Sequence, residues 1–284
     1  MRLSTARKIQ VAKLASKGLI GARRLVGRGA QARVQRRGLN WDLDLQEGID
    51  LSIFLLGAFE PSTVDAYSRL VRPGATVLDI GANIGAHTLP LARLCGSAGR
   101  VIAFEPTRFA FEKLRRNVAL NPEVATHVSC QQVMLVGAEG AVLEDAIYSS
   151  WPLDRQRGNE LHAEHKGRLM STQEASAETL DSALSRLDVA RVDFIKLDVD
   201  GHEPDVLSGA RSTIAGSRPP ILMELAPYVF RADMSRFRFM LDFLWSLGYE
   251  LTDIDSGRQL PRDIDQVIAV IPQDGGINVL GRPA

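Results

Sequence analysis

Cysteine is scarce in this chain of 284 residues, which contains only Cys95 and Cys130. Two isolated cysteines provide neither a disulfide framework nor the paired spacing of a zinc site. Long apolar runs are also missing, because the longest one, residues 51–59, is broken by Ser52 and Gly57 and is too short to cross a bilayer. No segment reads as a secretory signal. We therefore expect a soluble cytoplasmic protein with one main domain.

Aromatic residues make up only 6% of the chain, and its formal net charge is zero. Proteins that bind single-stranded nucleic acids use stacking aromatic side chains in basic grooves, so this composition argues against such ligands. The zero net charge conceals an asymmetry. Residues 1–40 contain eleven Lys and Arg and no acidic residue, whereas the remainder contains 23 basic and 34 acidic residues.

The basic N-terminal arm has helical spacing over residues 5–26. Apolar or small residues recur on one face of such a helix, namely Val11, Leu14, Gly18, Ala22 and Leu25. A basic helix of this kind could lie on an anionic membrane surface, contact nucleic acid, or pack against the acidic body of its own domain. A solvated, partly disordered arm is the alternative.

The most informative segment is V-L-D-I-G-A-N-I-G at residues 77–85. A short apolar run carries Asp79 into a turn with Gly81 and Gly85, and a helical pattern follows. Glycine allows the backbone angles of a tight turn and a close approach to a ligand. A second apolar run, residues 101–104, ends in Glu105, where a carboxylate can accept hydrogen bonds from two ribose hydroxyls. These features predict half of a nucleoside-binding sheet.

The glycine pattern of dinucleotide-binding proteins is absent. Asn83 and Ala86 occupy the second and third glycine positions of G-x-G-x-x-G. An acid at position 79 would repel a pyrophosphate, but it is favourable beside the ammonium and sulfonium of S-adenosylmethionine. We therefore expect S-adenosylmethionine rather than NAD. An ordinary strand-to-helix turn in an α/β protein is the alternative.

Six motifs occur in one order along the chain. They are VLDIGANIGAHT (77–88), AFEP (103–106), LRRNVALN (114–121), TLDSAL (179–184), DFIKLDVDGHEPDVLSGA (193–210) and ILMEL (221–225). Together they resemble the FkbM-type family of S-adenosylmethionine-dependent methyltransferases. Asp200 and His202 stand where that family usually has glutamate and alanine. The segment 131–140 is dissimilar to the family's adenine-side loop.

The resemblance implies an α/β fold of the class I methyltransferase type, a Rossmann-like, doubly wound seven-stranded sheet whose last strand is antiparallel. It also implies O-methylation of a hydroxyl on a sugar, glycolipid or secondary metabolite. Two alternatives are a nucleic-acid methyltransferase and a non-catalytic cofactor-binding partner module. We expect a small-molecule or glycan acceptor rather than nucleic acid, and peripheral contact of residues 1–40 with an anionic membrane surface stays open.

The candidate site follows from strand ends that meet at one edge of a parallel sheet. The residues expected to bind the cofactor are Asp79, Gly81, Ala82, Asn83, Gly85, His87, Thr88, Glu105, Pro106 and Asp198. A hydroxyl acceptor must lose its proton as the new bond forms, so a base is needed. The catalytic candidates are Asp198, Glu203, Lys196 and His202. Capping of the next helix is the alternative role for Glu203.

The chain divides into four predicted regions. Residues 1–40 form the basic arm, and residues 41–74 form an N-terminal hairpin over 41–56 and a helix that begins at Pro61. Residues 75–284 form the S-adenosylmethionine-binding domain, in which 148–178 is either a lid or a flexible insert. His162 and His165 lie in that insert, but no further histidine or cysteine completes a zinc set, so we expect no metal.

Overall fold

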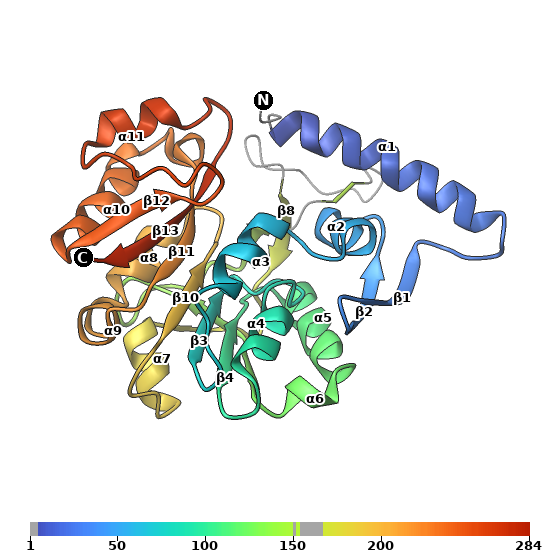
Figure 1. Cartoon of the computed structure of the whole chain (residues 1–284), viewed down its shortest axis with the longest axis horizontal. Coiled ribbons are helices and arrows are strands. Elements are labelled where there is room, and N and C mark those ends of the chain that lie inside the picture. The colour runs from blue at the N-terminus through green and yellow to red at the C-terminus, as the bar shows by residue number, and fades with distance from the viewer. Residues whose placement is uncertain (1–4, 150–151, 154–166) are drawn as a thin grey trace.

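The computed structural model describes residues 5–149, 152–153 and 167–284, and a seven-stranded sheet forms its centre (Figure 1). The strand order is β12-β13-β11-β10-β3-β4-β5. The strands are β3 (Thr76–Ile80), β4 (Arg100–Phe104), β5 (Val128–Gln131), β10 (Phe194–Leu197), β11 (Ile221–Leu225), β12 (Tyr249–Asp253) and β13 (Ile277–Pro283). Strand β13 is antiparallel to both neighbours, and the other pairings are parallel. The predicted sheet and its antiparallel last strand are confirmed.

Two apolar cores lie on opposite faces of the sheet because successive side chains of a strand alternate. Leu78 and Ile80 of β3 point into one core, whereas Val77 points into the other. The first face is covered by α7 (Leu180–Arg186), α8 (Glu203–Ser208), α9 (Arg211–Ser217), α10 (Met234–Ser246) and α11 (Ile264–Val270). The second face is covered by α3 (Pro61–Ser68), α4 (Thr88–Cys95), α5 (Arg108–Ala119) and α6 (Pro122–Ala125).

Chain order reverses between β3 and β10. From β3 the chain proceeds outward to β4 and β5, and it returns on the other side of β3 to form β10 and β11. In such sheets the carboxyl ends of the strands that flank the reversal form a ligand crevice. The ends of β3 and β10, at Ile80 and Leu197, pair in register. The topology therefore puts the predicted site at this edge of the sheet.

The predicted hairpin over 41–56 is wrong. The hairpin is formed by β1 (Gln31–Arg36) and β2 (Leu39–Asp44), and the chain reverses at Arg37 and Gly38, which both have positive φ. Such two-residue turns match the twist of antiparallel strands. Residues 48–56 form helix α2 (Gly48–Leu56) instead, ended by Gly57 in the left-handed conformation. The alternating apolar residues of 49–53 fit a strand equally well by sequence, but tertiary packing selects a helix.

Helix α1 (Thr5–Arg24) lies in the arm, and the face that packs against the body is not the face on which the sequence groups its apolar residues. Ile20 is buried against Leu45, Leu51 and Leu153, and the Ser16 Oγ donates to the Leu45 carbonyl oxygen at 2.7 Å. The predicted apolar face, including Val11, Leu14 and Leu25, points to solvent. The helix packs against the body through Leu19 and Ile20, and the small side chains of Ala12 and Ala15 permit the close approach.

Three smaller features complete the fold. The helical segment after Pro204 is divided into α8 and α9 near Gly209, where a Cβ would lie 2.2 Å from the Val136 carbonyl oxygen. The Asp233 side chain caps α10 by accepting the Ser235 amide. Two pairs of short strands lie outside the main sheet. They are β6 (Val133–Leu135) with β9 (Ser176–Glu178), and β7 (Ala146–Ser149) with β8 (Arg168–Ser171). The segment η2 (Pro227–Phe230) is a 3-10 turn.

No helix within the described ranges has the length and apolar character of a membrane span.

Glu47 gives the fold a testable pH dependence. Burial raises the pKa of its carboxyl to about 7, although Arg168, 3.6 Å away, opposes the rise. A pKa above the unfolded value means that the native state binds this proton more tightly, so stability falls as pH rises from about 4.5 to about 7. We expect Glu47→Gln to remove up to about 3 kcal/mol of this pH dependence. Urea unfolding of both proteins at pH 5 and pH 8 measures it, and identical pH dependence would contradict the prediction.

Candidate functional site

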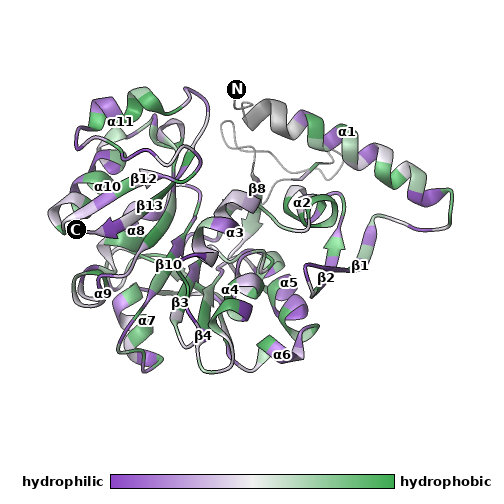
Figure 2. Ribbon diagram, in the orientation of Figure 1, coloured by the Kyte–Doolittle hydropathy of each residue, from purple (hydrophilic) through white to green (hydrophobic). Residues whose placement is uncertain are grey.

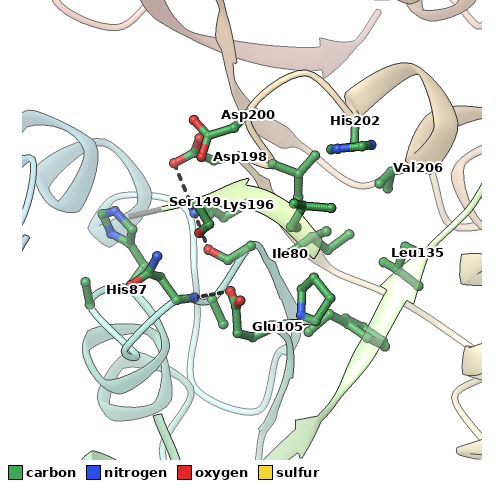
Figure 3. Close-up of a pocket in the computed structure, with 18 of the residues that line it drawn as sticks. Ile80, His87, Glu105, Leu135, Ser149, Lys196, Asp198, Asp200, His202 and Val206 are labelled. Carbon is green, nitrogen blue, oxygen red and sulfur yellow. Dashed lines mark hydrogen bonds and ion pairs between the residues drawn. The ribbon is translucent and has the colours of Figure 1, made fainter. Parts of the chain in front are cut away.

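A pocket opens at the carboxyl ends of β3, β4, β10 and β11 (Figure 3). Glu105 lies at one end, Asp198 and Asp200 lie at the other, and Lys196 lies between them. Of the predicted residues, nine line the pocket: Gly81, Ala82, Asn83, His87, Glu105, Pro106, Lys196, Asp198 and His202. Four do not line it: Asp79, Gly85, Thr88 and Glu203. The topology thus assembles most of the predicted set.

The turn after β3 is fitted closely between neighbouring strand ends. The amide nitrogens of Gly81 and Ala82 donate to the Phe104 carbonyl oxygen at 3.0 and 2.9 Å. Gly81 has a φ of 77°, and a Cβ at this position would lie 1.8 Å from the Asp198 carbonyl oxygen. Only glycine satisfies both the left-handed backbone and this approach. Gly85 instead packs against Leu114.

Glu105 is buried at the end of β4. One carboxylate oxygen accepts the Asn83 amide at 2.9 Å, and the other accepts the amide and hydroxyl of Thr107 at 2.9 and 2.5 Å. Burial raises the pKa of Glu105, although these hydrogen bonds lower it. A carboxylate has about four acceptor positions. The oxygen that holds Asn83 therefore retains a position for one ligand hydroxyl at the pocket wall.

Asp79 lies behind the pocket wall, not on it. Its Oδ2 accepts the Thr88 hydroxyl at 2.6 Å, and its Oδ1 lies 3.7 Å from the Lys196 Nζ. Burial raises the pKa of Asp79, and the Lys196 charge opposes this. Asp79, which the sequence predicts beside the ligand cations, does not line the pocket: Lys196 lies beside one of its oxygens, and Thr88 donates to the other from the first turn of α4.

Lys196 is buried between two carboxylates. Its Nζ donates to the Gly81 carbonyl oxygen at 3.2 Å and lies 3.4 Å from the Asp198 Oδ2. Burial by itself lowers the pKa of Lys196, but the carboxylates of Asp198, Asp79 and Glu60 raise it overall. A proton held this firmly makes Lys196 unsuitable as the base that the sequence left open. It fixes the orientation of Asp198 instead.

Four carboxyl groups line the far end of the pocket: Glu60, Asp198, Asp200 and Glu224. Burial, and then the charges of the neighbouring carboxylates, raise the pKa of Asp200 and of Glu224 well above their usual values. This favours their protonated forms, which can donate hydrogen bonds to an oxygen of a ligand. Among these four groups, Asp198 is the one whose carboxylate lies beside Lys196, and its side chain is 31% exposed.

Glu60 lines the pocket, where the sequence left open either a cover of the site or an ordinary helix entry before Pro61. It precedes Pro61 with a φ of 44°, a conformation that costs energy outside glycine and is common at functional sites. Its Oε2 accepts the Thr63 hydroxyl at 3.0 Å and the Asn278 Nδ2 at 3.1 Å. Burial and the charge of Asp198 raise the pKa of Glu60. Contacts with a strand 218 positions away hold this carboxyl in the pocket.

Glu203 and the two histidines differ in their surroundings. The Glu203 oxygens accept the Val199 and Gly201 amides at 3.0 Å each, so this predicted base candidate stabilises the loop and does not line the pocket. His202 lines the pocket, with its Nδ1 3.8 Å from the Asp205 Oδ2. His87 is buried beside Phe59 and Tyr67, and burial lowers its pKa well below the usual value, so it is neutral.

An apolar wall completes the Glu105 end of the pocket. Ile80, Phe104 and Val206 line it together with β6, whose three residues are Val133, Met134 and Leu135. The sequence left the adenine contacts of residues 131–140 undecided, because this segment is dissimilar to the family's adenine-side loop. Strand β6 directly follows β5, whose carboxyl end reaches the same edge of the sheet. The position of β6 directly after β5 was the signal that could have predicted that its residues line the pocket. Ile147, Tyr148 and Ser149 of β7 add a further side.

Parts of the predicted insert lie outside the described residues, including Trp151, His162 and His165. Among the residues that the structure does describe, no group of three or more His, Cys, Asp or Glu side chains is arranged to hold a metal ion.

The sequence of this chain matches the model of one protein family. The model of the FkbM methyltransferase domain matches residues 79–251. The chain is 32% identical over 120 residues to an rRNA methyltransferase from Streptomyces thermotolerans, covering 42% of this chain and 38% of that protein. It is 29% identical over 156 residues to Methyltransferase sdnD of Sordaria araneosa, covering 47% of this chain and 59% of that protein.

A solved structure, Methyltransferase FkbM from Methylobacillus flagellatus KT, is similar with a TM-score of 0.41 and 17% identity. The match covers 77% of this chain and 50% of that chain. The chain thus spans less than two thirds of the length of each of these three relatives.

Proposed function

Because this chain belongs to the FkbM methyltransferase family, we propose that it transfers the methyl group of S-adenosylmethionine to a hydroxyl of a small molecule or glycan. The observation that carries this proposal is the division of the pocket. A carboxylate and an apolar wall suited to a nucleoside lie at one end, and Asp198 beside Lys196 lies at the other.

The residues at the Glu105 end fit S-adenosylmethionine, which supplies an electrophilic methyl group when it is bound. Glu105 retains an acceptor position for a ribose hydroxyl, and Val133, Met134 and Leu135 offer apolar contact for the adenine. Gly81 permits the close approach of the Asp198 backbone, which a Cβ would prevent, and so brings the two strand ends together at the pocket. We assign Ala82, Asn83, His87 and Pro106 to the same cofactor site.

We expect Glu105→Gln to weaken S-adenosylmethionine binding by about tenfold or more. A hydrogen bond to a charged acceptor contributes roughly 1.5–3 kcal/mol, and the amide removes that charge. Isothermal titration calorimetry measures the affinity, with Glu112→Gln as the control because Glu112 is exposed on α5 and pairs with Arg108. Thermal unfolding of both variants checks that the fold is kept. An unchanged affinity in Glu105→Gln would remove the ribose role.

The Asp198 end of the pocket is the acceptor end, because it offers a base for an acceptor hydroxyl. Methyl transfer is an in-line displacement: the acceptor oxygen bonds to the methyl carbon as the carbon–sulfur bond breaks, and the hydroxyl proton leaves to a base. We assign Asp198 as this base, because it lines the pocket, is partly exposed and is oriented by the charged Lys196. Asp200, Glu224 and Glu60 can hold further oxygens of a polyhydroxylated acceptor.

The test is the transfer of tritiated methyl groups into a cell extract. The labelled extract is then fractionated into glycans, lipids, RNA and small molecules. We expect label in the glycan or small-molecule fraction and, by NMR, an O-methyl signal in the purified product. Asp198→Asn, run in parallel, shows which label depends on the pocket. An N-methyl product, or tight cofactor binding with no product in any fraction, would overturn it.

Nucleic-acid methylation is the second candidate, favoured by the rRNA methyltransferase among the relatives. Four carboxyl groups at the acceptor end oppose it, because those that are ionised repel phosphates. Label confined to the RNA fraction of the same experiment would establish this second function.

A further inference from the structure

Exposed hydrophobic side chains are concentrated in the N-terminal part of the molecule. Among the described residues, six of the nine large hydrophobic side chains that are exposed belong to α1, the turn after it and the end of α2: Val11, Leu14, Leu25, Val26, Leu55 and Leu56. The exposure is high, 69% for Leu14 and 88% for Leu25. Exposed apolar groups that gather in this way mark an interaction surface.

The outward face of α1 combines these groups with positive charge. Val11 and Leu14 lie on the side opposite the buried Ser16 and Ile20, at helical spacing, and Leu25 lies in the turn that follows the helix. Figure 2 shows the alternation of hydrophobic and hydrophilic residues along this helix. Lys17, Arg24 and Arg28 are exposed in the same region. Residues 1–40 contain no acidic residue, so nothing in the arm neutralises them.

The surface is held in place before any partner binds. Ser16 and Ile20 fix the helix to the body, and the Arg23 guanidinium donates to the carbonyl oxygens of Gly29 and Gln31 at 2.9 and 3.0 Å. Helix α1 packs on Leu51 of α2, and Ile49 of α2 lines the pocket. Helix α2 therefore contacts both α1 and the pocket.

We propose that α1 and the end of α2 form a surface that binds anionic phospholipid bilayers peripherally. Cations suit the headgroups, and the leucines and valines suit the boundary with the acyl chains. RNA would use the cations but would leave the apolar side chains in water. A second copy of the chain in a symmetric contact would place the same cations against each other. Bilayer binding accounts for both properties of the surface.

Flotation of the full chain with vesicles tests this inference. We use phosphatidylcholine vesicles with and without phosphatidylglycerol, and we expect binding to the anionic vesicles that falls as salt is raised. The double substitution Leu14→Glu with Leu25→Glu is expected to reduce the bound fraction at least about tenfold. The matched control is Val142→Glu with Val270→Glu, two exposed valines elsewhere, and it should bind like the native chain.

Equal binding by the two double variants, or no flotation of the native chain, would overturn the inference. Sedimentation velocity and RNA binding without lipid identify the other occupants. Self-association that Leu14→Glu with Leu25→Glu abolishes would assign the surface to a second copy. RNA binding that this variant weakens and the control variant keeps would assign the surface to RNA, because the added carboxylates repel phosphates. Affinity for S-adenosylmethionine should be the same in all variants, so failure here is separate from failure of the proposed function.

Discussion

Asp198→Asn is expected to lower turnover by about 10²- to 10⁴-fold, the usual contribution of a positioned general base. Asparagine has nearly the same shape and can still accept a hydrogen bond from Lys196, which lies 3.4 Å from the Asp198 Oδ2. It cannot take a proton from a hydroxyl at neutral pH. We therefore expect the affinity for S-adenosylmethionine to change by less than about tenfold, because the substitution affects proton transfer more than binding.

Release of S-adenosylhomocysteine, measured with the extract fraction that accepts label, gives the turnover of each variant. Asp205→Asn is the control, because Asp205 is close in sequence and pairs with Arg236 at 2.6 Å but does not line the pocket. Its turnover should be close to that of the native chain. If Asp198→Asn and the native chain had equal turnover, Asp198 would not be the base that accepts the hydroxyl proton. Asp200 and His202 would then have to be tested as the base.

Gly81→Ala is expected to abolish measurable cofactor binding, a loss of about a hundredfold or more. The added Cβ would lie 1.8 Å from the Asp198 carbonyl oxygen, far inside contact distance, and the backbone φ of 77° adds strain of roughly 1–2 kcal/mol. The ends of β3 and β10 must separate to relieve the overlap. Because both strand ends form the pocket, the loss of affinity should accompany a lower melting temperature.

Gly140→Ala separates these two effects. Gly140 has a φ of 76°, almost the same as Gly81, but a Cβ there meets nothing within 4 Å. It should therefore lower the melting temperature by the strain alone and leave cofactor affinity unchanged. If Gly81→Ala resembled Gly140→Ala in both measurements, the close approach of the two strand ends would not be required for the site.

The residues at the Glu105 end of the pocket were predictable from the sequence because their determinants are local. Gly81 follows an apolar run directly and Glu105 ends the next one, and parallel strands place their carboxyl ends at one edge of the sheet. The same logic located Asp198 after β10. Short apolar runs, turn residues and helix spacing encode element type and order, and the resemblance to the FkbM-type family implied the seven strands that the sheet has.

Roles that depend on partners distant in the chain were decided only by the tertiary structure. Glu60 lines the pocket because Asn278 from β13 holds its carboxyl there. Lys196 keeps its proton because Asp79 and Asp198 converge on it, and Glu203 is occupied by amides of its own loop. Helical periodicity showed that α1 has an apolar face but not which face the body would cover. A sequence pattern specifies local geometry, whereas the pKa and exposure of a side chain depend on groups that folding brings together.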